Sequence, residues 1–221
     1  MPTLDAVEAR VLGTLIEKAR TTPDYYPMRA SALVAACNQK SNRDPVTDYD
    51  QATVEAATER LSGLDLVFRV YQHDVRGVRY RHSAATALDV DPAEEALLCV
   101  LLLRGPQTVG ELRSRTERLF AFPSIAEVER VLGEMARRDS PLVIAMPRQP
   151  GQKEPRWRHA LGGGEDAVAP AIERAPASAP VTSPDENAER IASLERAMDA
   201  AREEIAELRA VIAELRASLG D

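Results

Sequence analysis

The feature of this sequence that most constrains its fold is an internal repeat with a period of about 80–90 residues. The first copy opens with Glu-Ala at residues 8–9 and closes on residues 79–82, and the second opens with Glu-Ala at 95–96 and closes on 156–159. In each copy, three segments with apolar residues at helical spacing precede two segments that resemble the strands of a hairpin. Three helices followed by a hairpin is the winged-helix order. The sequence therefore predicts a mainly α-helical fold with small β-wings, in which two winged-helix domains stand in tandem.

Helix-capping residues help to place the elements of both copies. A capping box, in which a polar side chain and a glutamate three residues later bond to each other's backbone amides, is expected at Asp5, Asp91, Thr108 and Ser124. A further cap is expected at either Asp48 or Asp50. The predicted helices are 6–19, 29–37 and 51–62 in the first copy and 92–104, 109–119 and 125–138 in the second. The predicted strands are 66–71 with 75–82 (the first hairpin) and 142–146 with 155–161 (the second hairpin).

Composition divides the rest of the chain. Residues 1–88 and 89–161 form the two expected domains, and residues 162–182 are rich in Gly, Ala and Pro, which is typical of a flexible linker. Residues 183–219 carry apolar side chains at alternating steps of three and four, which is typical of a coiled coil. Up to Leu161 the acidic and basic residues balance, so the net charge of −7 belongs to the tail.

The coiled-coil segment predicts a homodimer. Isoleucine dominates one set of seam positions and leucine the other, a pattern that favours a parallel two-stranded coil. The alternative is that this helix folds back on its own domains, but its apolar seam is narrower than a docking helix usually has. The expected dimerisation residues are Ile191, Leu194, Met198, Ala201, Ile205, Leu208, Ile212, Leu215 and Leu219.

Cysteine usage and hydropathy indicate a cytoplasmic protein. The first residues show neither a basic start nor an apolar run, so no signal peptide is expected. The longest apolar stretch, 96–103, is too short to cross a membrane, which takes about 20 residues. Cys37 and Cys99 match no metal or redox spacing, and each lies among apolar residues, so both are expected to be buried free thiols.

Four segments of the chain resemble the YceH family of bacterial proteins. They are LDAVEARVLG at 4–13, ACNQKSNRDPV at 36–46, LLLRGPQT at 101–108 and GELRSR at 110–115. The resemblance extends over nearly the whole chain, with mild departures at Asp50 and at residues 28–31. It implies tandem winged helices, but it implies little about activity, because the role of this family is unassigned and fold does not fix function.

Basic residues in both hairpins are the candidate nucleic-acid contacts. Each hairpin carries four cationic residues against one acidic residue, and arginines on a protruding wing suit phosphate oxygens. The alternative is a solvated outer face, with Tyr80 and Trp157 packed inward, which is the interpretation favoured for these two aromatic side chains. The full candidate set is Arg69, Arg76, Arg79 and Arg81; Arg148, Lys153, Arg156 and Arg158; Arg113 and Arg115; and Lys40 and Arg43.

Two observations limit the nucleic-acid hypothesis. The third helix of each copy, which would enter the major groove, carries at least as many carboxylates as arginines, and phosphates repel carboxylates, so base-specific reading through it is not expected. The polar segment 38–45 could contact a ligand, but its Asn, Asp and Pro residues favour a structural turn.

Motifs of catalysis are missing from the sequence. His73, His82 and His159 have no Cys or carboxylate set at metal-ligand spacing, and no phosphate loop or nucleophile elbow occurs. No enzyme activity, cofactor or metal is therefore expected. The sequence predicts a DNA-associated protein of the transcriptional-regulator kind, and the alternative is a protein-interaction or scaffold module.

Overall fold

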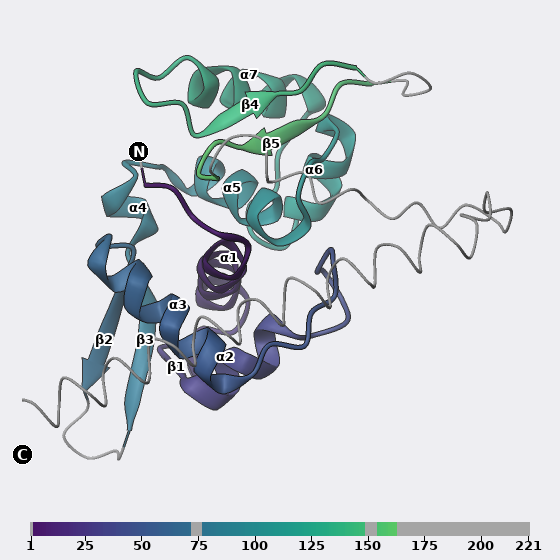
Figure 1. Ribbon diagram of the computed structural model, residues 1–221. Coiled ribbons are helices and arrows are strands. Elements are labelled where there is room, and N and C mark those ends of the chain that lie inside the picture. The colour runs from purple at the N-terminus through teal and green to yellow at the C-terminus, as the bar shows by residue number, and fades with distance from the viewer. Residues whose placement is uncertain (1, 72–76, 149–153, 163–221) are drawn as a thin grey trace, which may run out of the picture. The chain divides into compact units, whose positions relative to one another are not determined.

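The computed structural model describes residues 2–71, 77–148 and 154–162 (Figure 1). All of these residues belong to one compact unit, Met1–Ala169. About half of them are helical, and the strands form small antiparallel sheets, so the fold is a mixed α/β fold. The expected coiled coil, with its nine dimerisation residues, and nearly all of the expected linker lie outside the described residues. The expected division at residue 88 stays a prediction.

Each copy of the repeat contains three longer helices followed by a hairpin. The first copy comprises α1 (Ala6–Thr21), η1 (Pro23–Tyr25), β1 (Met28–Arg29), α2 (Ala30–Cys37), α3 (Gln51–Gly63), β2 (Val67–Tyr71) and β3 (Val78–His82). The short α4 (Ala84–Ala87) leads to the second copy, which comprises α5 (Pro92–Arg104), α6 (Val109–Thr116), α7 (Ile125–Ala136), β4 (Val143–Ala145) and β5 (Trp157–His159). The six predicted helices and four predicted strands are thus present, with ends shifted by a few residues.

Local capping explains why the helices begin where they do. Complete capping boxes form at Asp5, Asp91 and Thr108, as expected. Ser124 accepts a hydrogen bond from the amide of the residue three positions on, at 3.1 Å. Of the two candidate starts for α3, Asp50 provides the cap, since its carboxylate accepts the amide of Thr53 at 2.8 Å. Side-chain oxygens thereby bond amides that would otherwise lack a partner in the first turn.

Both sheets contain a pairing that the sequence did not predict. In the first copy the strand order is β1-β3-β2, all antiparallel, with Met28 opposite Tyr80. In the second copy β4 pairs with β5, and Gln107 forms an antiparallel bridge to Trp157 on the other side of β5. The segment before each second helix therefore adds to its own hairpin.

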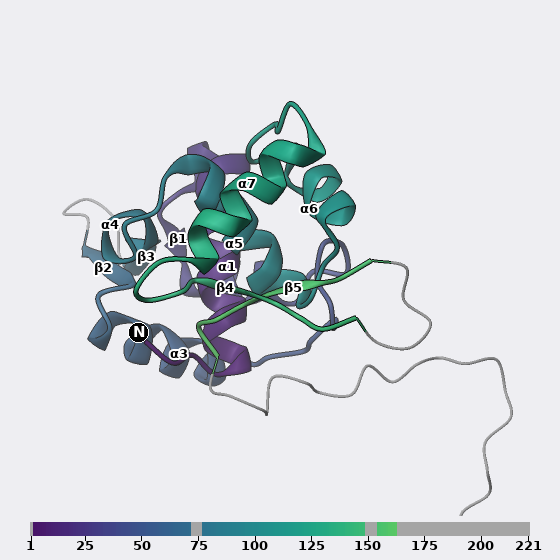
Figure 2. The ribbon, with the colours of Figure 1, turned by 90° about the horizontal axis from the view of Figure 1, so that it is seen from above.

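Helices α1 and α5 join the two copies into one core. Figure 1 shows α1 at the centre of the unit, with α2 and α3 on one side and α5 on the other. The sequence predicts one inward face for the first helix, but α1 is buried all round from Glu8 to Glu17, because it packs against both copies. The chain ends of the unit also meet, since the Leu4 amide donates to the Leu161 carbonyl at 2.6 Å. Figure 2 shows α7 and the β4–β5 hairpin of the second copy from above.

The two thiols are free and buried, as the sequence predicts. Cys99 donates to the carbonyl of Gly13 at 3.3 Å, and Cys37 lies 3.6 Å from the hydroxyl of Thr14. Burial raises the pKa of both thiols, so the protonated form dominates at neutral pH. Within the described part of the chain, none of the helices has the length and apolar character to span a bilayer.

Candidate nucleic-acid interface

The outer face of the β1-β3-β2 sheet gathers arginines from two strands. Residues directly opposite each other in an antiparallel sheet project from the same face. Arg79 lies opposite both Arg29 on β1 and Val70 on β2, and Arg81 lies opposite Phe68. These five side chains therefore share one face, which we call the basic sheet face.

The opposite face of this sheet packs on the core. Val67 is fully buried and Tyr80 is nearly so, and both belong to the hydrophobic core. The structure thus confirms the favoured interpretation of Tyr80 as a packing residue. Trp157 is likewise partly buried against the core of the second copy. Because side chains alternate along a strand, burial of Tyr80 turns Arg79 and Arg81 outward.

The arginines of the basic sheet face have few partners. Arg81 lies over the ring of Phe68, with its guanidinium carbon 5.4 Å from the ring centroid. Arg79 donates to the carbonyl of Pro27 at 2.9 Å, and Arg29 is exposed. No carboxylate among the described residues forms an ion pair with any of the three. The positive charge of Arg29 and Arg81 is exposed to an anionic partner, whereas Arg79 is half-buried.

A shallow groove of about 530 Å³ lies beside this face. Phe68 and Tyr71 contribute aromatic surface to it, and they are 41% and 72% exposed. Arg69 and Arg81 contribute charge, although Arg69 lies 3.4 Å from the carboxylate of Glu59. Exposed aromatic rings beside arginines are the arrangement on which nucleobases stack.

The second hairpin offers less free charge. Arg156 donates to the carbonyl of Pro106 at 2.8 Å and pairs with Glu111 at 3.1 Å. Arg158 is only partly exposed and lies opposite Ile144, while Arg148 is exposed. The expected candidates Arg76 and Lys153 lie outside the described residues.

Among the remaining predicted contacts, Arg115 lies near the second hairpin, because it shares Glu111 with Arg156. Lys40 is exposed in the loop after α2. On α6, Arg113 donates to the carbonyl of Phe122 at 3.4 Å, and Arg115 pairs with Glu111 at 3.3 Å. These three residues come from other elements than the basic sheet face, so the structure divides the predicted set.

The prediction that Arg43 contacts nucleic acid is wrong. Its side chain is completely buried and donates to both carboxylate oxygens of Glu17, at 2.8 and 3.2 Å, and to the carbonyl of Ala36. Asn38 in the same loop holds the backbone of Tyr49 through its amide. Both side chains fix the loop to the core, as the turn interpretation predicts.

The third helices present little free positive charge, as the sequence predicts. On α3, Arg60 turns back to Asp5 and Glu8 at the start of α1. On α7, Arg130 lies between Glu127 and Glu134, 2.6 Å from each. Neither helix therefore presents an array of free cations to base edges.

Sequence reasoning missed Arg29, because a two-residue strand carries no periodic signal. Among the described residues, no group of three or more His, Cys, Asp or Glu side chains is placed to hold a metal ion.

Comparison with known proteins places the chain in a family. A family model described as "Protein of unknown function, DUF480" matches residues 4–152. A UPF0502 protein of Pelobacter propionicus is 48% identical over 210 residues, covering 95% of this chain and 94% of its own. The UPF0502 protein GSU0233 of Geobacter sulfurreducens is 48% identical over 192 residues, which is 87% of each chain. The finer YceH name stays an interpretation of the sequence. This chain belongs to the DUF480 family, whose members among these relatives are called UPF0502 proteins.

Proposed function

We propose that this chain is a non-enzymatic, nucleic-acid-associated protein that holds phosphates on its basic sheet face. The observation that carries the proposal is the convergence of Arg29, Arg79 and Arg81 beside the exposed ring of Phe68. Guanidinium groups bind phosphate oxygens. Such contacts position a protein on a nucleic acid without reading the base sequence. We therefore expect binding that does not depend on the base sequence and that weakens strongly with added salt.

The fold that we propose for this activity is a pair of winged-helix domains. Support comes from the repeated order of three helices and a hairpin, and from the extra strand pairing that both copies share. The few free cations on α3 and α7 favour contact through the hairpin sheet over insertion of a helix into the major groove.

A protein-interaction module is the second candidate function. Tyr25 and Tyr71 are 78% and 72% exposed in the first copy, and exposed aromatic side chains are also typical of protein interfaces. The two functions differ in the role of charge, because phosphate binding releases counterions and weakens steeply with salt.

The double substitution Arg29→Ala and Arg81→Ala tests the nucleic-acid function. We expect it to weaken binding to a short DNA duplex by about tenfold or more and to reduce the slope of log affinity against log salt by about 2, since two phosphate contacts are lost. Fluorescence anisotropy at two or more salt concentrations measures both quantities. Arg79 is left in place because it also bonds the backbone of Pro27.

A matched control removes the same charge elsewhere. The double variant Arg130→Ala and Arg137→Ala changes α7 and should leave affinity and salt slope close to those of the parent. If the α7 variant loses more DNA affinity than the Arg29→Ala and Arg81→Ala variant, the interface lies on α7 instead. Absence of DNA binding at low salt would contradict the function and favour the protein-interaction alternative.

We further propose that the protein is a homodimer through residues 183–219, which lie outside the described residues. Two basic sheet faces on one dimer would engage one duplex with a raised effective concentration. In sedimentation equilibrium, we expect a dimer for the full chain and a monomer for a chain ending at Gly162. The double variant Ile205→Asp and Leu208→Asp should also be monomeric, because it places charge in the seam. A dimeric truncation would contradict this assignment.

A further inference from the structure

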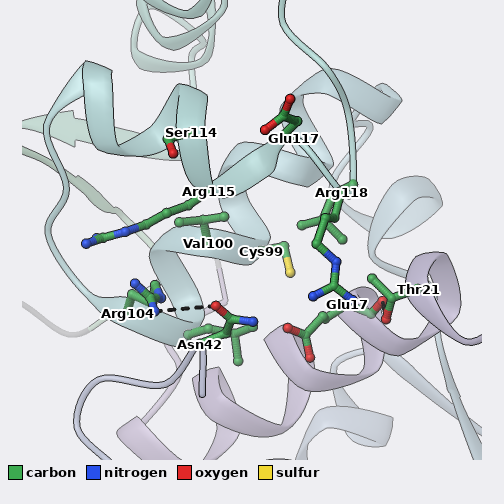
Figure 3. Close-up of a pocket in the computed structure, with 12 residues that line it drawn as sticks. Glu17, Thr21, Asn42, Cys99, Val100, Arg104, Ser114, Arg115, Glu117 and Arg118 are labelled. Carbon is green, nitrogen blue, oxygen red and sulfur yellow. Dashed lines mark hydrogen bonds between the residues drawn. The ribbon is translucent and has the colours of Figure 1, made fainter.

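A second site lies where the two copies meet. A pocket of about 240 Å³ opens between α1, the loop after α2, α5 and the α6 region (Figure 3). Val100 and Leu103 on α5 supply an apolar floor, and Arg104 follows them at the end of the same helix. Arg118, in the turn after α6, completes the pocket together with Asn42. This pocket is separate from the basic sheet face.

Two arginines of this pocket lack anionic partners. Figure 3 shows the guanidinium groups of Arg104 and Arg118 on opposite sides of the pocket. Arg104 bonds Asn42 at 3.4 Å, and its Nε is buried with no acceptor among the described residues. Arg118 forms no hydrogen bond or ion pair within the part of the chain that the structure describes. Guanidinium groups that lack an anionic partner are suited to bind an anion that enters the pocket.

The charged neighbours leave the pocket attractive to anions. Burial, followed by the positive charge of Arg115, lowers the pKa of Arg104, although Asp44 and Glu111 oppose the shift. Arg115 itself is paired with Glu111. Two carboxylates line the pocket. Glu17 already forms ion pairs with the buried Arg43 and with Lys18. The negative charge of Glu117 is therefore outweighed by the positive charges of Arg104 and Arg118, which have no anionic partner among the described residues.

We propose that this pocket binds a small organic dianion in which a short hydrocarbon chain joins two carboxylates. One carboxylate would bond Arg104 and the other Arg118, since guanidinium groups bond carboxylates through two parallel hydrogen bonds. The hydrocarbon chain would lie on Val100 and Leu103, which water solvates poorly. The volume suits a compact ligand, because pockets for drug-sized molecules begin at about 300 Å³.

Isothermal titration calorimetry with the full chain tests this proposal. Succinate and glutarate are the probes, and butyrate, which has one carboxylate, is titrated at the same ionic strength. We expect saturable binding of at least one dicarboxylate. Butyrate should bind at least about tenfold more weakly than that dicarboxylate, because only one arginine can pair with it. Arg118→Gln should weaken dicarboxylate binding by about tenfold or more, and Arg104→Gln should do the same.

Controls separate a specific site from general charge effects. Arg130→Gln on α7 removes one positive charge away from the pocket and should leave dicarboxylate binding unchanged. Circular dichroism and the melting temperature establish that each variant folds. The proposal is overturned if neither dicarboxylate saturates below about 10 mM, if butyrate or inorganic phosphate binds as tightly, or if Arg118→Gln binds like the parent. DNA binding does not enter these measurements, so their outcome is independent of the proposed function.

Discussion

Replacing Arg43 by methionine is expected to lower the free energy of unfolding by about 3–5 kcal/mol. The Arg43 side chain is completely buried, and its guanidinium bonds both oxygens of Glu17 and the carbonyl of Ala36. Removing it leaves the Glu17 carboxylate buried with only Lys18 as an ion-pair partner. A buried charge that loses its main partner costs more than the loss of one hydrogen bond between neutral groups. Urea unfolding at pH 7 measures the change.

The loss of stability in Arg43→Met depends on pH, and the state of Glu17 gives its direction. Burial alone would raise the pKa of Glu17, but the hydrogen bonds and positive charge of Arg43 outweigh it and hold the pKa below its ordinary value of 4.5. The stabilising contribution of the ionised pair is therefore present above pH 4.5 and is lost as the pH falls through the lowered pKa. In Arg43→Met, burial dominates and protonation relieves the penalty. The difference between parent and variant should therefore begin to shrink above pH 4.5, as Glu17 of the variant takes up a proton, and shrink further below pH 4.5, as the parent loses its ionised pair.

A charge-free pair provides the control for Arg43→Met. The double variant Glu17→Leu and Arg43→Met removes both charges, so it should be more stable than Arg43→Met alone. Arg130→Met removes an arginine from two exposed ion pairs and should change stability little. If Arg43→Met unfolds like the parent, or if the double variant is the less stable of the two, the buried pair does not have the role assigned to it.

Replacing Gly13 by leucine is expected to lower the free energy of unfolding by about 3 kcal/mol or more. A Cβ atom at Gly13 would lie 3.0 Å from Leu102 Cβ and from two atoms of Leu103, so α1 and α5 approach closely at this position. A larger side chain would force the two helices apart, and both copies of the repeat contribute to the core around them. Thermal and urea unfolding measure the loss, and Gly13→Ala should give a smaller one.

Gly110 is the matched control for Gly13. It lies in the first turn of α6, and a Cβ atom there would meet nothing within 4 Å. Gly110→Ala should be neutral or stabilising, because alanine loses less backbone freedom on helix formation. If Gly13→Ala matches Gly110→Ala in stability and Gly13→Leu is tolerated, the close contact between α1 and α5 is not what joins the two copies.

The sequence by itself determined the helices, their starts and the inward direction of Tyr80. These depend on interactions over a few residues, such as the bond from the Glu8 amide to Asp5, and on the alternation of side chains along a strand. The reach of such interactions is short, so the same reasoning misplaced helix ends, where no comparable cap marks the last turn of α6.

Tertiary structure alone decided which arginines face solvent and which lie inside. Arg29 reaches the basic sheet face only because β1 pairs with β3, some 50 residues later in the chain. Arg43 looks like a surface cation in its polar loop, but Glu17 on α1 draws it into the core. The pocket lined by Arg104 and Arg118 likewise requires α1 and α6 to lie on either side of α5. Such contacts join residues far apart in sequence, and neither periodicity nor charge within a local window records which partner each residue meets.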